Sequence, residues 1–507
     1  MWLCTLALAA PPSPDPIRAR IDPELWQAEA APVQVVVEGS LTAFRAGEAG
    51  FLVEEEAEGL LQLRVAPSEL SRLAALPGVE RVRKPWRPTI KNTVSEGYAE
   101  VMLQDWHDQK LRGKGLRIGV LDVGFVGLEE LPATERPSDL TTDFSRGEPD
   151  RWDHGTAVTE VIHDFAPEAD FVLATFSTDV EFCAAAEFLR EEKVDLINAS
   201  VGFDNLWPAD GSSNVSRCVQ EVVDGGTAWF AAAGNENHRY RIGELSYDDD
   251  GFLALGGISD LQIPTTLGNF SVVFRWTEPM GEAEQDLDLQ AFNEDGSLCG
   301  SSSRSQAGRG FSPLEEISAF DCSKLVQLRI VSEGQVAKIE GLRGFLYSPL
   351  GLPTTLRTSG EDLTLPADAE GAITVGAYDP ASDSIFGYSS QGPTEDGRAK
   401  PDVVGPSSVT TVTYGFAGFE GSSAAAPHAA GLGALWIDAT GKRRKPEQIK
   451  AWMMEGARDL GEEGPDLVYG AGAIQGDEPP PCGCTAGGGA SLLPGLVGLL
   501  AVRRRRS

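Results

Sequence analysis

Short apolar runs alternate with helix-like runs along residues 117–456, and few folds accommodate such a pattern. Strands are expected near 117–121, 171–175, 194–198, 228–232 and 372–376, and helices near 154–165, 180–192, 214–224, 423–437 and 446–456. Strands that alternate with helices favour a mainly parallel sheet with helices on both faces. The sequence therefore predicts an α/β domain over about residues 95–475.

A different pattern interrupts this domain between about residues 245 and 362. Apolar side chains there recur at every second position, and Gly- and Ser-rich turns separate the runs. The strand-like runs are 270–276, 287–292, 326–330 and 344–347. Period-two runs between turns are typical of half-buried strands. We expect an all-β insertion, a small sandwich, within the α/β domain.

A small α+β unit is expected ahead of this domain, at residues 22–90. Its expected strands lie near 33–37, 60–65 and 79–83, and its helix lies over 67–76. A linker with prolines and an exposed Lys91-Asn92 pair follows it. A chain of 507 residues is long enough for about two to four domains.

The run from Gly421 to Gly431 places a serine, Ser423, at the entrance of an Ala-rich helix. Pro427 is expected in the first turn of that helix, where a missing N–H costs nothing. The small side chains let the helix pack closely on the layer beneath it. A serine at a helix N-terminus lies beside backbone N–H groups that can stabilise an oxyanion. Taken alone, Ser423 is also compatible with an ordinary helix cap.

A serine nucleophile needs a base, and the base needs an orienting carboxylate. Among the five histidines, His154 begins an amphipathic helical pattern, whereas His428 is expected to pack structurally. Asp122 ends one apolar strand and Asn235 follows another. Both would then lie at the carboxyl edge of the sheet, where open α/β sheets build their sites. Taken singly, Asp122 and Asn235 also suit turns, and His154 suits a helix cap.

In this order, Asp122, His154, Asn235 and Ser423, the chain resembles the subtilases, the subtilisin-like serine proteases. The run Gly421–Gly431 fits that family's Gly-[Ser/Thr]-Ser-x-Ala-x-Pro-His-x-Ala-Gly pattern. Other motifs that carry the resemblance are His154-Gly155-Thr156, Gly234-Asn235, Asn198–Gly202, Ser390–Pro393, Lys400–Asp402 and Tyr469–Gly472. The resemblance spans about residues 95–475 and is interrupted once. It departs from the family at Val123, where Ser or Thr usually follows the aspartate.

The resemblance implies a role for each of these residues. Ser423 would attack the scissile carbonyl, and His154 would take and return the proton. Asp122 would orient His154, and Asn235 would donate to the oxyanion. The segment Ser200, Val201 and Gly202 resembles the strand that lines the substrate cleft. Residues 22–90 resemble the inhibitory propeptides of this family, with a plain accessory domain as the alternative.

Acidic residues outnumber basic ones by 76 to 42, which gives a net charge of −34. Such a chain repels nucleic acid, so a role in binding DNA or RNA is not expected. Carboxylates can also bind Ca²⁺, which many subtilases use, and structural calcium is therefore left open as a cofactor. No stretch has convincing ligand spacing, and no metal ligand is assigned. Asp286 and Asp288 alternate on one strand face and are interpreted as solvated residues.

Seven cysteines are present, and four of them lie away from the chain ends. Cys299 and Cys322 flank one polar stretch and are candidates for a local bridge. Cys183 and Cys218 could pair or could remain as buried thiols. No cysteine spacing suggests a zinc site.

Both ends of the chain carry patterns that suggest export. Residues 1–16 combine a short apolar run, a small-x-small cleavage pattern and a Pro-rich junction. Residues 479–507 combine Cys482 and Cys484, an apolar stretch and four arginines. This tail resembles the MYXO-CTERM class of bacterial sorting signals, which implies processing near a cysteine and display at the cell surface. An uncleaved membrane anchor is the alternative.

The sequence as a whole predicts an exported, surface-associated serine endopeptidase that hydrolyses peptide bonds. Its expected partners are protein or peptide substrates and the sorting machinery of the cell envelope, and the enzyme is expected to be a monomer. One rival is a non-catalytic surface binding protein on a decayed subtilase scaffold. A second rival, an intracellular processing enzyme, is opposed by the two terminal signals.

Overall fold

The computed structural model describes most of the chain between residues 32 and 476. The described residues are 17, 20, 21, 25, 32–57, 60–83, 95–148, 150–249, 251–303, 306, 312–332, 338–441 and 444–476. The expected export signal, the linker and the C-terminal tail lie outside them. The chain divides into two compact units, Met1–Lys91 and Asn92–Ser507, which are considered separately.

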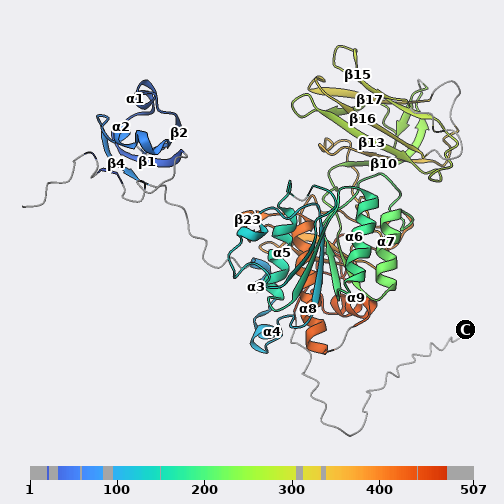
Figure 1. Ribbon diagram of the computed structural model, residues 1–507. Helices are drawn as coiled ribbons and strands as arrows, with labels where there is room; N and C mark the ends of the chain where they lie inside the picture. Colours follow the sequence, from blue (N-terminus) through green and yellow to red (C-terminus); the bar gives the residue numbers. More distant parts are fainter. Residues whose placement is uncertain are drawn as a thin grey trace, which may run out of the picture. The chain divides into compact units, whose positions relative to one another are not determined.

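The first unit is an antiparallel sheet with short helices, drawn in blue in Figure 1. Its strands are β1 (Val33–Gly39), β2 (Val53–Ala57), β3 (Leu60–Val65) and β4 (Val79–Arg83), in the order β2-β3-β1-β4. Its helices are α1 (Ala43–Glu48) and α2 (Leu70–Ala74), with a 3₁₀ turn at Pro67–Glu69 before α2. Leu61, Leu63 and Val65 alternate inward along β3, so one face of the sheet forms the core. The helix expected over 67–76 is therefore split, and α1 was not predicted.

The second unit is built on a mainly parallel sheet, which confirms the predicted α/β fold. The order is β20-β19-β9-β8-β5-β7-β6, and β21 also pairs with β19. The strands are β5 (Arg117–Asp122), β6 (Leu140–Asp143), β7 (Asp170–Thr175), β8 (Leu196–Ala199), β9 (Ala228–Ala232), β19 (Ile373–Asp379), β20 (Ser384–Ile385) and β21 (Val403–Pro406). Only the short β20 pairs antiparallel to its neighbour among these described strands.

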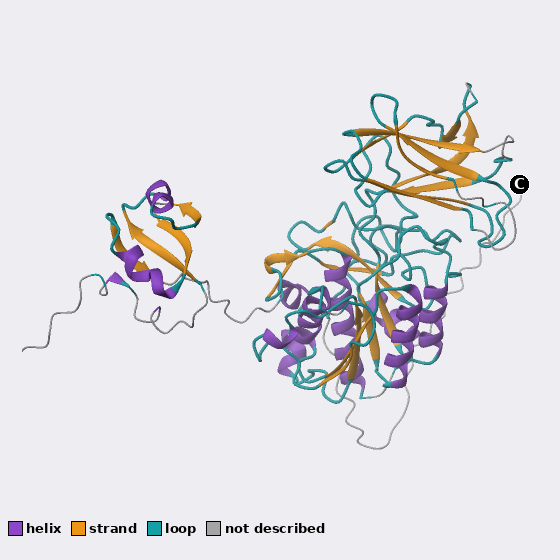
Figure 2. Ribbon diagram, turned by 45° about the horizontal axis from the view of Figure 1, so that its top comes forward, coloured by secondary structure: helices purple, strands orange, loops and turns teal. Residues whose placement is uncertain are grey.

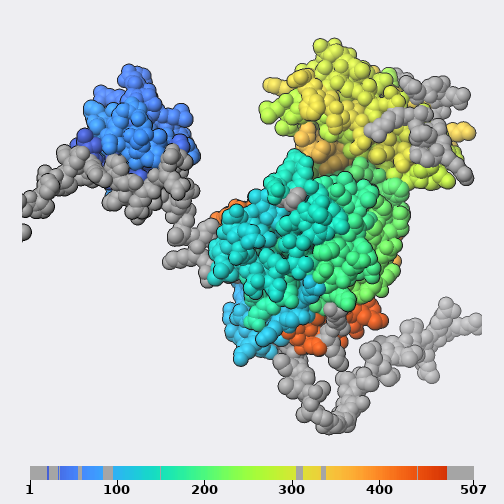
Figure 3. Space-filling model, in the orientation of Figure 1, coloured from blue at the N-terminus to red at the C-terminus, as the bar shows by residue number. Residues whose placement is uncertain are grey.

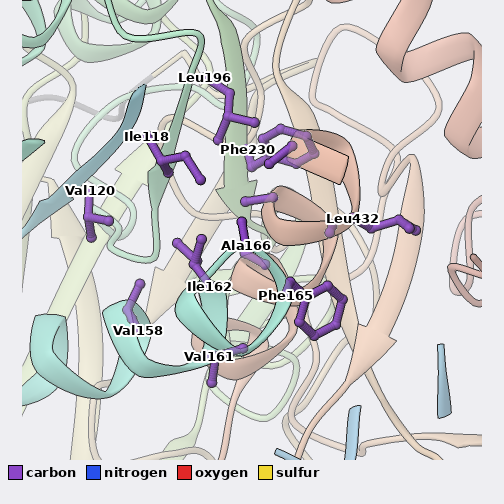
Figure 4. Packing of buried hydrophobic residues seen from close by; sticks show 14 of the residues in the cluster. Ile118, Val120, Val158, Val161, Ile162, Phe165, Ala166, Leu196, Phe230 and Leu432 are labelled. Atoms are coloured by element: carbon purple, nitrogen blue, oxygen red, sulfur yellow. The ribbon is translucent and has the colours of Figure 1, made fainter. Parts of the chain in front are cut away.

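Helices cover both faces of this sheet (Figures 1 and 2). The helices are α3 (Glu96–Glu100), α4 (Gln104–Asp108), α5 (His154–Phe165), α6 (Asp179–Glu191), α7 (Asn214–Asp224), α8 (Ser422–Thr440) and α9 (Pro446–Glu455). Side chains from one face, such as Ile118 and Val120, pack with α5 and α8, as Figure 4 shows. Leu121 points to the other face and packs with α6 and α7. Successive strand residues point to opposite faces, so each strand contributes to two separate cores.

Helix α8 differs from its predicted form in the position of Pro427. The helix begins at Ser422, so Pro427 lies in its second turn, and the expectation of a first-turn proline is wrong. Proline lacks an N–H, which leaves the carbonyl of Ser423, four residues earlier, without its usual helical donor. The Ser200 hydroxyl donates to that carbonyl over 3.0 Å. A bond from outside the helix thus offsets the missing one.

The all-β insertion is a compact lobe, coloured yellow in Figure 3. Its strands are β10 (Tyr240–Tyr247), β11 (Leu253–Leu255), β12 (Leu261–Pro264), β13 (Phe270–Trp276), β14 (Leu287–Phe292), β15 (Leu298–Ser302), β16 (Leu314–Ala319), β17 (Leu325–Ser332) and β18 (Arg343–Tyr347). Strand β10 pairs with β11 at one end and with β18 at the other, so it joins two half-sheets. A single apolar core lies between them. The insertion's sheet begins at Tyr240, earlier than the predicted boundary at 245.

Polar contacts attach the insertion to the α/β domain. The Asn205 side-chain amide donates to the carbonyls of Val273, over 3.1 Å, and Phe345, over 2.9 Å. Arg275 of β13 forms an ion pair with Glu395. A small hairpin, β22 (Val409–Thr411) and β23 (Gly415–Phe419), completes the described structure just before α8. In the described part of the chain, no helix combines the length and apolar character needed to cross a membrane.

Candidate active site

Asp122 is the last residue of β5 and is fully buried. One carboxylate oxygen accepts the backbone N–H of Val123 over 2.8 Å. Both oxygens contact Nδ1 of His154, at 2.9 and 3.0 Å. The carboxylate is therefore held by the backbone and by His154. Val123 has no side-chain hydroxyl, and no other hydroxyl is among these contacts of the carboxylate.

His154 is the first residue of α5, and its side chain is about one quarter exposed. Burial lowers the pKa of His154, but the charge and hydrogen bond of Asp122 outweigh this effect, and the pKa is raised above its usual value. A carboxylate beside Nδ1 favours the tautomer with its proton on Nδ1. Nε2 of the neutral ring is then free of a proton and can act as a base.

Ser423 is the second residue of α8 and is partly exposed. Its hydroxyl donates to the Ser200 carbonyl over 3.0 Å. No hydrogen bond joins this hydroxyl to His154 within the described residues. Such bonds are often loose before substrate binds.

The register of the parallel sheet brings these residues to one edge. Val120 of β5 lies opposite Asn198 of β8, so Asp122 and Ser200 are level at the carboxyl ends of neighbouring strands. Ser423 is bonded to Ser200, and His154 is bonded to Asp122. The predicted Asp122, His154 and Ser423 therefore lie around one point.

Asn235 follows β9 and is tied to the start of α8 through Ser422. Its side-chain oxygen accepts the Ser422 N–H over 2.8 Å and the Ser422 hydroxyl over 3.2 Å. The Ser422 hydroxyl in turn accepts the Gly234 N–H over 3.0 Å. With its oxygen so occupied, Asn235 presents its NH₂ group as a donor. A Cβ at Gly421 would lie 2.9 Å from that nitrogen, and Gly421 has φ +104°, so glycine fits there on both counts.

The predicted substrate strand, Ser200 to Gly202, leaves the sheet beside these groups. Ser200 is buried, and its hydroxyl accepts the Asn198 amide over 3.0 Å while donating to Ser423. Val201 is half-buried against the core under α6 and α7, and Gly202 is exposed. An exposed glycine at a strand end leaves backbone groups accessible to a peptide.

Three residues that shape the site were not predicted from the sequence: Ser422, Tyr388 and Ser407. Tyr388 and Ser407 accept the Gly421 N–H over 3.1 and 2.9 Å, which fixes the entrance of α8. Ser422 stood inside the predicted motif, so a signal for it was present. Tyr388 and Ser407 meet Gly421 only through the fold.

His428 packs structurally, as the sequence analysis expected. Its Nδ1 donates to the Ala424 carbonyl over 2.7 Å, and its Nε2 accepts from the Ser95 hydroxyl over 2.7 Å. Burial lowers the pKa of His428 to about 4, so the ring is neutral at physiological pH. Neither nitrogen is available as the base for Ser423.

The described residues contain no group of three or more His, Cys, Asp or Glu side chains that could hold a metal ion. Asp288, interpreted from the sequence as solvated, is in fact buried, and that interpretation is wrong. The Asp286 carboxylate accepts the Gln306 N–H over 2.9 Å. These positions give no calcium ligand set.

Comparison with known proteins finds partial similarities. Residues 354–472, which include Ser423, match the model of the subtilase family. A 149-residue stretch is 28% identical to the serine protease AprX of Bacillus subtilis (strain 168), covering 24% of this chain and 33% of that protein. The chain thus matches about a third of the length of this curated relative.

The fold is similar to that of the CspB protease of Clostridium perfringens. The TM-score is 0.55 at 18% sequence identity, with 75% of this chain and 95% of that chain covered. At this identity the similarity concerns the fold. The family match covers the segment that contains Ser423, and the solved protease shares the fold.

Proposed function

We propose that this protein is an exported, subtilisin-like serine endopeptidase. Ser423 attacks the scissile carbonyl, and Nε2 of His154 takes the hydroxyl proton and then gives it to the leaving amine. Asp122 holds Nδ1 and stabilises the imidazolium that forms. The Asn235 NH₂ group and the Ser423 N–H donate to the oxyanion of the tetrahedral intermediate.

The contact of 2.9 Å between the buried Asp122 carboxylate and His154 Nδ1 carries this proposal. It fixes the tautomer and orientation that a general base requires, at the sheet edge where Ser423 lies. A scaffold that only binds ligands has no need of a buried carboxylate paired with a partly exposed histidine. Burying a charged carboxylate beside a histidine costs free energy, and catalysis gives a reason for that cost.

Labelling the purified protein with a fluorophosphonate probe tests this function. We expect one label per chain, located on Ser423 by mass spectrometry. Ser423→Ala should abolish labelling and peptide hydrolysis, while Ser384→Ala, at an exposed serine in β20, should change neither. Absence of labelling in a folded wild-type protein would favour the non-catalytic binding protein instead.

We also propose that the first unit is a propeptide. Ser95 supports a cleavage site ahead of it, because its N–H donates to Asp164 over 2.7 Å and its hydroxyl bonds His428. Residues from Ser95 onward are thus part of the second unit's own packing. Cleavage is therefore expected ahead of Ser95, within 84–94.

Export to the cell surface is part of the same proposal. A disulfide between Cys183 and Cys218 links α6 to α7, and a second joins Cys299 and Cys322 in the insertion. Disulfides persist in oxidising compartments, which supports an extracytoplasmic location. The terminal segments 1–16 and 479–507 are proposed to direct export and surface sorting. We also propose that the enzyme is a monomer. A structural calcium ion is proposed without assigned ligands.

A further inference from the structure

Two glycines flank the place where the substrate carbonyl would be held. Gly202 ends the substrate strand that begins at Ser200, and Gly234 precedes the oxyanion donor Asn235. The strands that lead to them, β8 and β9, are neighbours in the parallel sheet. The region between Gly202 and Gly234, called the slot below, therefore lies at the carboxyl edge of the sheet, next to Ser423.

The side chain of Thr364 fills this slot. A Cβ on Gly202 would lie 2.0 Å from Thr364 Oγ1, and a Cβ on Gly234 would lie 2.1 Å from Thr364 Cγ2. The hydroxyl of Thr364 thus faces Gly202, and its methyl group faces Gly234. Thr364 is only 4% exposed, so it closes the slot rather than lining an open cavity.

The backbone on both sides holds Thr364 in this position. The Thr364 N–H donates to the Ala233 carbonyl over 3.0 Å. Leu365 and Phe203 exchange two backbone bonds, of 3.1 and 2.9 Å. The backbone of residues 364–365 is therefore held at the ends of the two strands, and it cannot shift without breaking these bonds.

This segment is the point at which the chain returns from the insertion to the α/β domain. The Thr358 N–H donates to the Tyr240 carbonyl over 2.9 Å, and the Thr358 hydroxyl accepts the Ile242 N–H over 2.9 Å. Glu361 pairs with Arg343 of β18, with one contact of 3.1 Å. The insertion therefore anchors the residues that lead into Thr364.

The geometry of attack relates Thr364 to the substrate. A carbonyl held between the Ser423 hydroxyl and the Asn235 NH₂ group belongs to the residue on the acyl side of the scissile bond. A substrate backbone that runs along Ser200–Gly202 would direct the side chain of that residue toward the slot between the glycines. Thr364 occupies the volume that a large side chain would need.

We propose that Thr364 restricts this enzyme to bonds that follow a small residue, namely Gly, Ala or Ser. The inference deepens the proposed function and rests on it. Excluding a side chain by volume in a small pocket discriminates between substrates about 10- to 200-fold for a methylene-sized difference. A larger residue such as Phe would require Thr364 and its backbone partners to move.

The test compares peptides that differ only at the acyl-side residue, carrying Ala, Leu or Phe. For the wild-type enzyme we expect kcat/KM to be at least about tenfold higher for Ala than for Phe. Thr364→Gly should reduce or invert this ratio. Thr364→Ser leaves the backbone less flexible than glycine does, and it should shift the ratio in the same direction. Thr364→Val keeps the volume and should preserve the ratio. Fluorophosphonate labelling of each variant reports whether Ser423 is still reactive.

The possible results of this test distinguish the inference from the proposed function. A wild-type preference for Phe, or a ratio unchanged in labelled Thr364→Gly and Thr364→Ser, overturns this inference and leaves the proposed function standing. Absence of both labelling and cleavage in the wild-type protein overturns the proposed function and this inference with it. A small-residue preference that Thr364→Gly relaxes and Thr364→Val retains supports the inference.

Discussion

At the scale of single residues, the contact between Asp122 and His154 controls the protonation of the proposed base. Asp122 raises the pKa of His154, so the unprotonated base is lost as the pH falls through that raised value. The acidic limb of kcat/KM should therefore lie above the pH expected for an isolated histidine.

Asp122→Asn should lower turnover by about 10⁴-fold, because an amide can hold His154 in the wrong tautomer. It should also move the acidic limb to lower pH, since the charge that raises the pKa of His154 is gone. A pH series of kcat/KM on a peptide substrate measures both effects. Turnover within about tenfold of wild type, with an unmoved limb, would contradict the assigned roles.

Asn235 and Ser422 should act as a unit. Asn235→Ala removes an oxyanion donor and should lower kcat by about 10²–10³-fold with little change in KM. Ser422→Ala removes the hydroxyl that bonds both Asn235 and Gly234, so a smaller loss is expected. In the double variant, the loss should equal that of Asn235→Ala alone, because Ser422 acts through Asn235. Fully additive losses would show that Ser422 acts by another route.

At the scale of elements, the carboxyl groups of Asp362 and Asp204 lie where the insertion meets the α/β domain. Burial raises the pKa of Asp362 to about 7, with a smaller contribution from the charge of Glu236. One oxygen accepts the Gln391 N–H over 2.6 Å, and the other has no partner among the described residues. Burial likewise raises the pKa of Asp204 to about 7. Both groups therefore keep their protons to a higher pH in the folded protein than in the unfolded chain.

This arrangement predicts a loss of stability as the pH rises from about 4 to about 7, the interval over which only the folded state holds these protons. Asp362→Asn keeps the acceptor for Gln391 and cannot ionise. Its free energy of unfolding should exceed that of the wild type by an amount that grows on the order of 2 kcal/mol between pH 5 and pH 7. Urea unfolding at several pH values measures the difference. Asp204 still titrates in the variant, so part of the pH dependence of stability remains. If the free energies of unfolding of the wild type and the variant change with pH in parallel, the prediction is refuted.

At the scale of the whole molecule, the first unit is expected to leave by self-cleavage. Ser423→Ala should accumulate as a precursor that retains residues 22–90. The active wild-type enzyme should begin within 84–94, because Ser95 is already bonded into the second unit. N-terminal sequencing of both proteins is the measurement. Fully active enzyme with residues 22–90 still attached would leave the first unit as an accessory domain.

The C-terminal tail, residues 479–507, is expected to determine the location of the enzyme. Its apolar stretch is rich in Ala and Gly and contains Pro494, so it suits a transient sorting helix better than a permanent anchor. Deleting 485–507 should release active protease into the medium, and replacing Cys482 and Cys484 with Ser should trap the unprocessed protein in the membrane. Mass spectrometry of the mature surface protein should find no peptide from 485–502. Recovery of that stretch would indicate an uncleaved anchor.

The amino-acid sequence determined the alternation of strands and helices, and with it the α/β fold. Apolar periodicity is a local property, so β5, α5, α7 and β9 lie within a residue or so of their predicted ranges. The sequence also indicated candidate catalytic side chains, because a serine nucleophile requires a fixed set of partners in recognisable local settings.

Only the tertiary structure decided how distant segments meet. Ser200 bonds Ser423 across 223 residues, Ser422 bonds Asn235 across 187, and Thr364 lies between two glycines contributed by different strands. The tertiary structure also accommodates Pro427 in the second turn of α8, since the donor that replaces its missing N–H comes from Ser200. Such contacts depend on strand order and register, which the periodicity of any one segment does not specify.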